Sequence, residues 1–99
     1  GAKNIATLNI SKPTFSEQVV ALGKNNQPER IKIQIHFTYS LYNKEGKIIQ
    51  GPARITSSRD FNVDPLNLLS ADSERHIVKT ELFQDSISKL MRRITRSMT

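Results

Sequence analysis

Apolar and polar residues alternate along the segment Arg30–Tyr42. Every second position carries a large apolar residue, and these positions are Ile31, Ile33, Ile35, Phe37, Tyr39 and Leu41. Because successive side chains of a strand point to opposite faces of its sheet, six matches to a period of two predict a half-buried β-strand. One face of this strand should pack on a core, and the other should meet solvent.

The segments on either side of this strand predict two neighbours for it. Asn43–Gly46 combines an Asn, which can bond its own backbone, with a Gly that is free to take a positive φ, so we expect a hairpin turn. The returning strand is Lys47 to about Phe61, with a bulge or edge position at Gly51–Pro52, because proline has no N–H for the ladder. An earlier strand lies within Ala6–Leu22, and the polar loop Gly23–Pro28 joins it to the alternating one. The simplest arrangement is an antiparallel three-stranded meander.

After Phe61 the apolar residues change to helical spacing. Asp64–Pro65 marks a break, since the residue before a proline avoids the helical conformation, and Ser70 or Asp72 can cap the helix that follows. The helix is expected from about residue 70 to residue 96. Its apolar stripe contains Ile77, Phe83, Ile87, Leu90 and Ile94, and is widened by Leu82 and Met91.

These elements define an α+β fold: a three-stranded antiparallel meander followed by one long C-terminal helix packed on one face of the sheet. A helix of about 27 residues is roughly 40 Å long, and the 13-residue strand is roughly 43 Å long, so the helix can lie along the whole sheet. A helix about 10 Å wide covers only part of three strands about 4.8 Å apart. We therefore expect either a second helix, missing from this chain, or a dimer that pairs the apolar faces.

Composition indicates one small globular domain, residues 1–99, with 36% hydrophobic and 24% charged residues. The net charge of +6 favours polyanions such as nucleic acid, anionic lipid or a phosphorylated glycolipid. There is no cysteine and no apolar run of about 18 residues, so neither a disulfide framework nor a membrane-spanning helix is expected. Gly1 and Ala2 are candidates for a remnant of cloning, and the abrupt start in a strand-like segment suggests that natural upstream sequence has been removed.

The sequence offers no constellation for covalent chemistry. His36 and His76 have no acid at the spacing of a metal site or a catalytic triad, and no Gly-rich phosphate loop is present. We therefore expect a binding protein rather than an enzyme, without catalytic residues, metal or cofactor.

The order and spacing of several segments resemble the LptE family of lipopolysaccharide-assembly lipoproteins. The resemblance covers roughly residues 5 to 94. It includes Ala21–Leu22, Glu29, the alternating strand, Asn43–Gly46, Arg59–Asp60–Phe61, Asp64–Pro65, the helix segment Thr80–Asp85, Ile87, Leu90 and Arg92–Arg93–Ile94. Three positions depart from the family pattern, namely Arg30, Ala71 and the pair Asn25–Asn26.

The resemblance implies a non-enzymatic lipoprotein held on the periplasmic face of the Gram-negative outer membrane. Such proteins pack a sheet against two helices, plug and help to assemble the outer-membrane β-barrel LptD, and bind lipopolysaccharide. This chain would then lack the N-terminal strand, the first helix and the lipid-bearing cysteine of the family.

Four basic residues are candidates for contact with lipopolysaccharide phosphates. Lys24 lies in the loop where the family places a basic residue implicated in this contact, although an exposed loop lysine is usually only solvated. Lys32, Arg54 and Arg59 are expected to build a basic stripe on the wet face of the sheet, where charges also serve solubility and edge protection. Arg92, Arg93 and Arg96 are better explained as partners of the helix C-terminal dipole.

The main alternative is a basic nucleic-acid-binding module of the double-stranded-RNA-binding type, which also ends in strands and a helix. The acidic start of the helix, Ser70–Ala71–Asp72–Ser73–Glu74, speaks against it, because such modules place lysines there. The partners that the resemblance implies, the outer-membrane β-barrel LptD and lipopolysaccharide, are therefore expected rather than nucleic acid.

Overall fold

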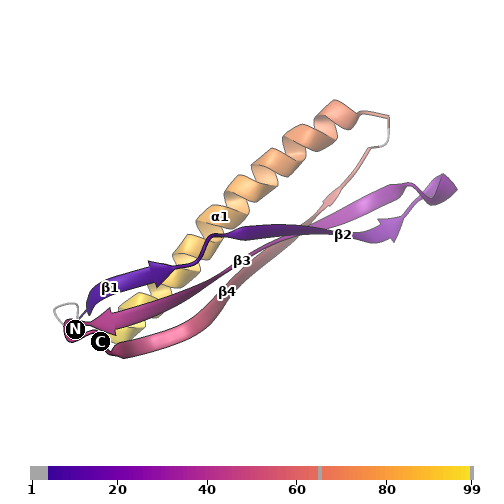
Figure 1. The fold of residues 1–99 in the computed structure, drawn as a ribbon. Coiled ribbons are helices and arrows are strands. Elements are labelled where there is room, and N and C mark those ends of the chain that lie inside the picture. The colour runs from indigo at the N-terminus through magenta and orange to yellow at the C-terminus, as the bar shows by residue number, and fades with distance from the viewer. Residues whose placement is uncertain (1–4, 65, 99) are drawn as a thin grey trace.

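The computed structural model describes residues 5–64 and 66–98, which form one antiparallel sheet and one long helix (Figure 1). Gly1, Ala2 and Pro65, singled out above, lie outside the described residues. The molecule is a rod of 59 × 20 × 18 Å. Its elements are β1 (Ile5–Ile10), β2 (Thr14–Leu22), the 3₁₀ turn η2 (Lys24–Asn26), β3 (Pro28–Asn43), β4 (Ile48–Asn62) and α1 (Leu68–Met98).

Strand β3 is the centre of the sheet. β4 pairs with it antiparallel from Arg30↔Asn62 to Tyr42↔Ile48, while β1 and β2 lie end to end along its other edge. The predicted α+β fold, an antiparallel meander with a C-terminal helix, is thus confirmed, but the first strand is divided and the sheet has four strands.

The division between β1 and β2 follows from Pro13, which has no N–H to donate to β3. Ser11 bridges the interruption twice. Its backbone N–H donates to the Thr38 carbonyl over 2.9 Å, and its hydroxyl oxygen accepts from the Thr38 N–H over 2.9 Å. The two short strands therefore stay in line along one edge of β3.

The hairpin between β3 and β4 forms as predicted. The Asn43 side-chain oxygen accepts from the backbone N–H groups of Glu45 and Lys47, and Gly46 has a φ of 83°. The predicted bulge is also confirmed, because the register slips where Leu41 faces Gln50 and Tyr39 faces Ala53. Gly51 occupies the slip with a φ of 87°, and a Cβ there would lie 2.5 Å from the Tyr39 carbonyl oxygen.

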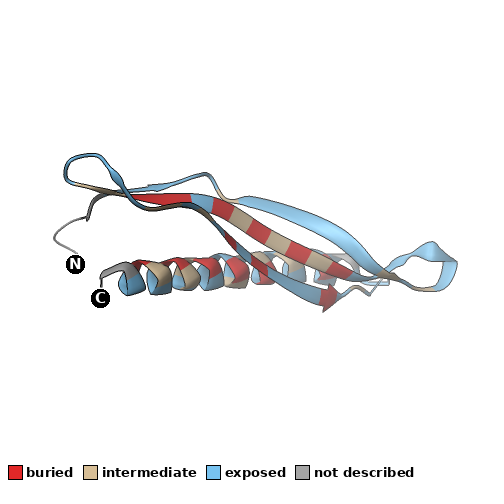
Figure 2. Ribbon diagram, turned by 90° about the horizontal axis from the view of Figure 1, so that it is seen from below, coloured by how far each residue is buried: buried red, intermediate tan, exposed pale blue. Residues whose placement is uncertain are grey.

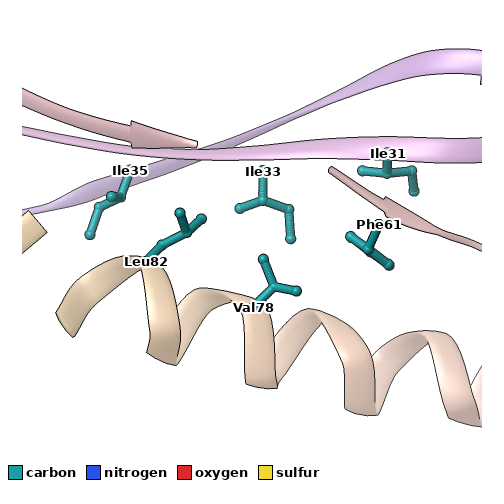
Figure 3. Close-up of a cluster of buried hydrophobic side chains, with 6 residues drawn as sticks. All are labelled: Ile31, Ile33, Ile35, Phe61, Val78 and Leu82. Atoms are coloured by element: carbon teal, nitrogen blue, oxygen red, sulfur yellow. The ribbon is translucent and has the colours of Figure 1, made fainter. Parts of the chain in front are cut away.

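The core lies between α1 and the face of β3 and β4 that carries the odd-numbered residues. All six apolar residues of the predicted alternation are buried, as the red and tan bands along β3 show in Figure 2. Ile31, Ile33, Ile35, Phe61, Val78 and Leu82 form one cluster (Figure 3). Phe37, Tyr39, Leu41, Ile55, Leu90 and Ile94 form the second.

The predicted start and stripe of the helix need correction. Asn67 caps α1 by accepting the Ser70 N–H, so the prediction of Ser70 or Asp72 as cap was wrong. Ile77, Phe83 and Met91 are 49%, 44% and 52% exposed, and the buried row is instead Val78, Leu82, Ser86, Leu90 and Ile94, with Ala71 before it. A spacing of four residues winds slowly around a helix, which lets the row follow the twist of the sheet beneath it. Leu82, Ile87, Leu90 and Ile94 were placed correctly.

α1 covers only part of the apolar face of the sheet, as we expected from the width of the sheet compared with that of one helix. Register places Leu8, Ile10, Phe15 and Val19 on the same face as their buried partners Leu41, Tyr39, Ile35 and Ile31. α1 packs on β3 and β4, and these four residues of β1 and β2 remain exposed. Whether a second helix or a second copy covers them stays a prediction.

Candidate binding surface

The face of the sheet opposite α1 carries an array of polar side chains. Register aligns nine of them in three rungs across β2, β3 and β4. The rungs are Gln18–Lys32–Asp60, Ser16–Gln34–Ser58 and Thr14–His36–Thr56, and together they form what we call the polar face. Hydroxyl and amide groups dominate it, so it presents many donors and acceptors with little net charge.

His36 lies in the third rung of the polar face, between Thr14 and Thr56. Its Nδ1 is shielded from solvent and has no hydrogen-bond partner among the described residues. A buried polar atom without a partner costs free energy unless something else meets it. This rung of the polar face therefore keeps one hydrogen-bonding position without a partner among the described residues.

The four basic residues predicted for lipopolysaccharide contact do not come together. Lys32 and Arg54 share the polar side of the sheet, but Arg54 faces Thr38, which is six positions from Lys32 on β3, or roughly 20 Å. Arg59 faces Ile33, so it lies on the helix side, where it forms an ion pair with Glu81 of α1. The predicted stripe of three basic residues is therefore not formed, and the role of each residue in lipopolysaccharide contact stays a prediction.

Lys24 lies at the tip of the rod in η2. It lines a cavity of about 500 Å³ together with Gly23, Gln27, Pro28, Glu29, Val63 and Asp64. Asn25 and Asn26 take φ values of 59° and 58°, a conformation that Asn tolerates better than most residues, which explains how this loop turns without a central glycine. A phosphate bound by Lys24 would also meet the carboxylates of Glu29 and Asp64, which weakens its attraction.

The margin between α1 and β4 is closed by polar contacts that the sequence did not reveal. Lys89 donates to the Thr56 carbonyl over 2.9 Å, and Arg93 donates to the Arg54 carbonyl over 3.1 Å. Ser57 donates to the Asp85 carboxylate over 2.7 Å. This hydrogen bond lowers the pKa of Asp85 below its ordinary value, and the Lys89 ammonium acts in the same direction. Helix side chains thus occupy backbone acceptors at the edge of β4.

The described residues show neither a metal-binding cluster nor a membrane-crossing helix. Within residues 5–64 and 66–98, no three His, Asp or Glu side chains converge as a metal site would require. In the same part of the chain, α1 is too polar to serve as a membrane-crossing helix.

A model of the LptE family, described as lipopolysaccharide-assembly, matches residues 2–94. The chain belongs to the LptE family. A search of curated proteins found no match. Family membership assigns the chain to lipopolysaccharide assembly at the outer membrane, in a family of non-enzymatic lipoproteins. It favours this role over the RNA-binding alternative.

Proposed function

We propose that this LptE-family chain is the periplasmic domain of a lipid-anchored protein that plugs the outer-membrane barrel LptD and helps it to assemble. The observation that carries the proposal is the polar face, three rungs of mainly hydroxyl and amide side chains left open on the side opposite α1. The lumen of a large outer-membrane barrel is polar, and such surfaces pair well through direct and water-mediated hydrogen bonds.

The shape of the molecule supports the same proposal. A rod with a cross-section of 20 × 18 Å needs a wide lumen, since side chains already fill the interior of an eight-stranded barrel. Side chains of α1 cover acceptors of β4, so the outer edge of that strand is poorly suited to continue a sheet into a partner. The open polar face and the covered edge of β4 together favour docking through the polar face.

Lipopolysaccharide is the second proposed partner. Lys24 at the tip and Lys32 and Arg54 on the polar side offer cations to its phosphates, and Arg59 can join them only by leaving Glu81. Because these residues lie apart, we infer that they contact different phosphates or act at different stages of transfer.

The plug role is tested by co-purification of the barrel with the full-length, lipidated protein from cells. Gln34→Trp places a bulky side chain at the centre of the polar face and should reduce recovery of the barrel at least tenfold. Gln84→Trp, on the exposed side of α1, is the matched control and should leave recovery unchanged. Equal recovery with both variants would contradict docking through the polar face.

The lipopolysaccharide role is tested separately by binding at low and moderate salt. Lys24→Asp should weaken binding several-fold more than Lys44→Asp, which makes the same charge change in the exposed β3–β4 turn. Binding that is insensitive to both salt and Lys24→Asp would remove Lys24 from the proposal without affecting the plug role.

A further inference from the structure

The outer edge of β2 carries no further strand of the sheet. Among the described strands β2 pairs with β3 alone, and every residue of β2 except Ala21 is exposed. The opposite edge of the sheet is different, because Lys89 and Arg93 of α1 donate to backbone carbonyls of β4. Within residues 5–64 and 66–98, backbone groups without a cover therefore lie along the β1 and β2 side of the sheet.

The bonds between Ser11 and Thr38 show which backbone groups of β2 point outward. The Thr38 carbonyl accepts from the Ser11 N–H, and the Thr38 N–H donates to the Ser11 hydroxyl, so both backbone groups of Thr38 point toward the edge formed by β1 and β2. Backbone groups alternate in direction along a strand, so the other even-numbered residues of β3 also point toward β2, and they bond to the even-numbered residues between 14 and 18 that face them. The residues that direct their N–H and C=O outward are Phe15, Glu17 and Val19.

Little in this stretch protects it from pairing. Edge strands are commonly blunted by lysines, prolines or bulges. From Thr14 to Leu22 there is no lysine, arginine or proline, and the one charged residue, Glu17, accepts a hydrogen bond from Arg75 over 3.0 Å. The register with β3 slips only beyond Val19, so residues 14–19 form a regular edge that is open to another strand.

The open stretch is complementary to itself. If two copies meet antiparallel about Glu17, Phe15 lies opposite Val19 of the second copy on the helix side. On the polar side, Ser16 lies opposite Gln18 of the second copy. An aromatic residue opposite a β-branched one, and polar residues that can share a hydrogen bond, stabilise antiparallel strands. The outward groups of the three odd-numbered residues would form about six backbone hydrogen bonds between the copies.

The charge at the centre limits the strength of this pairing. Glu17 would lie opposite Glu17 of the second copy, and like charges directly opposite each other destabilise a strand pair. Arg75 offsets part of the repulsion, because its guanidinium lies 3.0 Å from the Glu17 carboxylate in each copy. The contact of two short strands is small, so the dimer is weak and forms at high protein concentration.

We propose that β2 pairs antiparallel with β2 of a second copy, which joins the two sheets into one. The pairing is isologous, since both copies contribute the same residues around a two-fold axis. It uses the edge of β2 and leaves the polar face open, so it does not depend on the proposed docking to a barrel.

Disulfide trapping with the 99-residue chain tests the register of the pairing. The sequence has no cysteine, so Ser16→Cys and Gln18→Cys each introduce a single thiol. Mixed in equal amounts and oxidised slowly, the two variants should yield mainly the mixed dimer, which mass spectrometry separates from the two like dimers. Residues directly opposite each other in a strand pair lie within reach of a disulfide, whereas like positions lie diagonally and farther apart. Ser58→Cys, at the β4 end of the same rung as Ser16, is the matched control and should give no excess of mixed dimer with Gln18→Cys.

Removal of one outward N–H tests whether backbone bonds make the contact. Glu17→Pro should keep the fold in circular dichroism, because the Glu17 N–H points away from β3, yet it should weaken dimerisation about tenfold in light scattering. Glu17→Gln is the matched control, since it also removes the charge but keeps the N–H, and it should strengthen dimerisation. The disulfide test stands without the proline variant, should that variant fail to fold.

The pairing is overturned if the mixed dimer shows no excess, or if folded Glu17→Pro associates as the parent chain does. Association that Phe15→Asp abolishes and Glu17→Pro does not would assign the contact to the apolar face instead. A monomer at every concentration would leave the edge to another protein. Either of these results also overturns the pairing of two copies through β2.

Discussion

Replacing Leu82 and Phe83 one at a time by alanine tests which side of α1 faces the sheet. Leu82 is 2% exposed and lies in the cluster with Ile33 and Ile35, whereas the neighbouring Phe83 is 44% exposed. Adjacent helix positions point about 100° apart, so only one of the two can lie at the centre of the packed face. The apolar stripe expected from the sequence contained both residues, with Phe83 among its main positions and Leu82 widening it.

The structure sets different costs for the two changes. Leu82→Ala removes three buried carbons, worth about 2.4 kcal/mol of transfer free energy. The residual cavity raises the expected loss of stability to about 3 kcal/mol. Phe83→Ala removes a ring that is almost half exposed, and alanine favours the helix by about 0.5 kcal/mol, so its net cost should be about 1 kcal/mol or less.

Urea unfolding followed by circular dichroism measures both values, provided that the m-values of the variants agree. A Phe83→Ala loss equal to or greater than the Leu82→Ala loss would refute the packing described here. It would mean that α1 is rotated toward the face that the sequence stripe suggested.

Three further outcomes follow from the structure. Gly51→Ala should destabilise the fold by about 3 kcal/mol in urea unfolding, because a Cβ would collide with the Tyr39 carbonyl. Gly46→Ala, the control, has open space around its Cβ and should cost only about 1 kcal/mol for its positive φ. Equal costs for the two variants would argue against the bulge at Gly51. The hydrogen bond from Ser57 lowers the pKa of Asp85 in the folded state. The ionised Asp85 therefore contributes its full stabilisation above the unfolded-state pKa of about 3.9, and this stabilisation is lost as the pH falls through the lower folded-state pKa. Asp85→Asn should therefore flatten the acid limb of a Tm–pH curve, and an unchanged limb would contradict the assignment. The exposed apolar residues of β1 and β2 should make the isolated chain self-associate, so its mass in light scattering should rise with protein concentration. This rise should be smaller for Phe15→Asp. A mass that stays that of the monomer at all concentrations would argue against an exposed apolar face.

The parts of the fold governed by local periodicity could be predicted from the sequence. The alternation around Ile33, the Asn43–Gly46 turn and the bulge at Gly51 each follow from chemistry within a few residues. The rotation of α1 could not be predicted, since Ile77 and Val78 are equally apolar and only the twist of the sheet decides between them.

The candidate site was harder to predict because it depends on which face each residue joins. Arg54 and Arg59 are separated by an odd number of positions in a continuous stretch of β4, so the period of two already excluded a shared face. The bonds from Lys89 and Arg93 to β4 had no sequence signal, because they arise between segments far apart in the chain.

Site-specific photo-cross-linking in cells tests the central claim, that the polar face docks inside an outer-membrane barrel, most directly. Photoreactive residues would replace Ser16 and Ser58 on the polar face and Gln84 on the exposed side of α1 in the full-length, lipidated protein. The account predicts that both polar-face positions capture the barrel and that the helix position does not. Capture from Gln84 with none from Ser16 and Ser58 would contradict it.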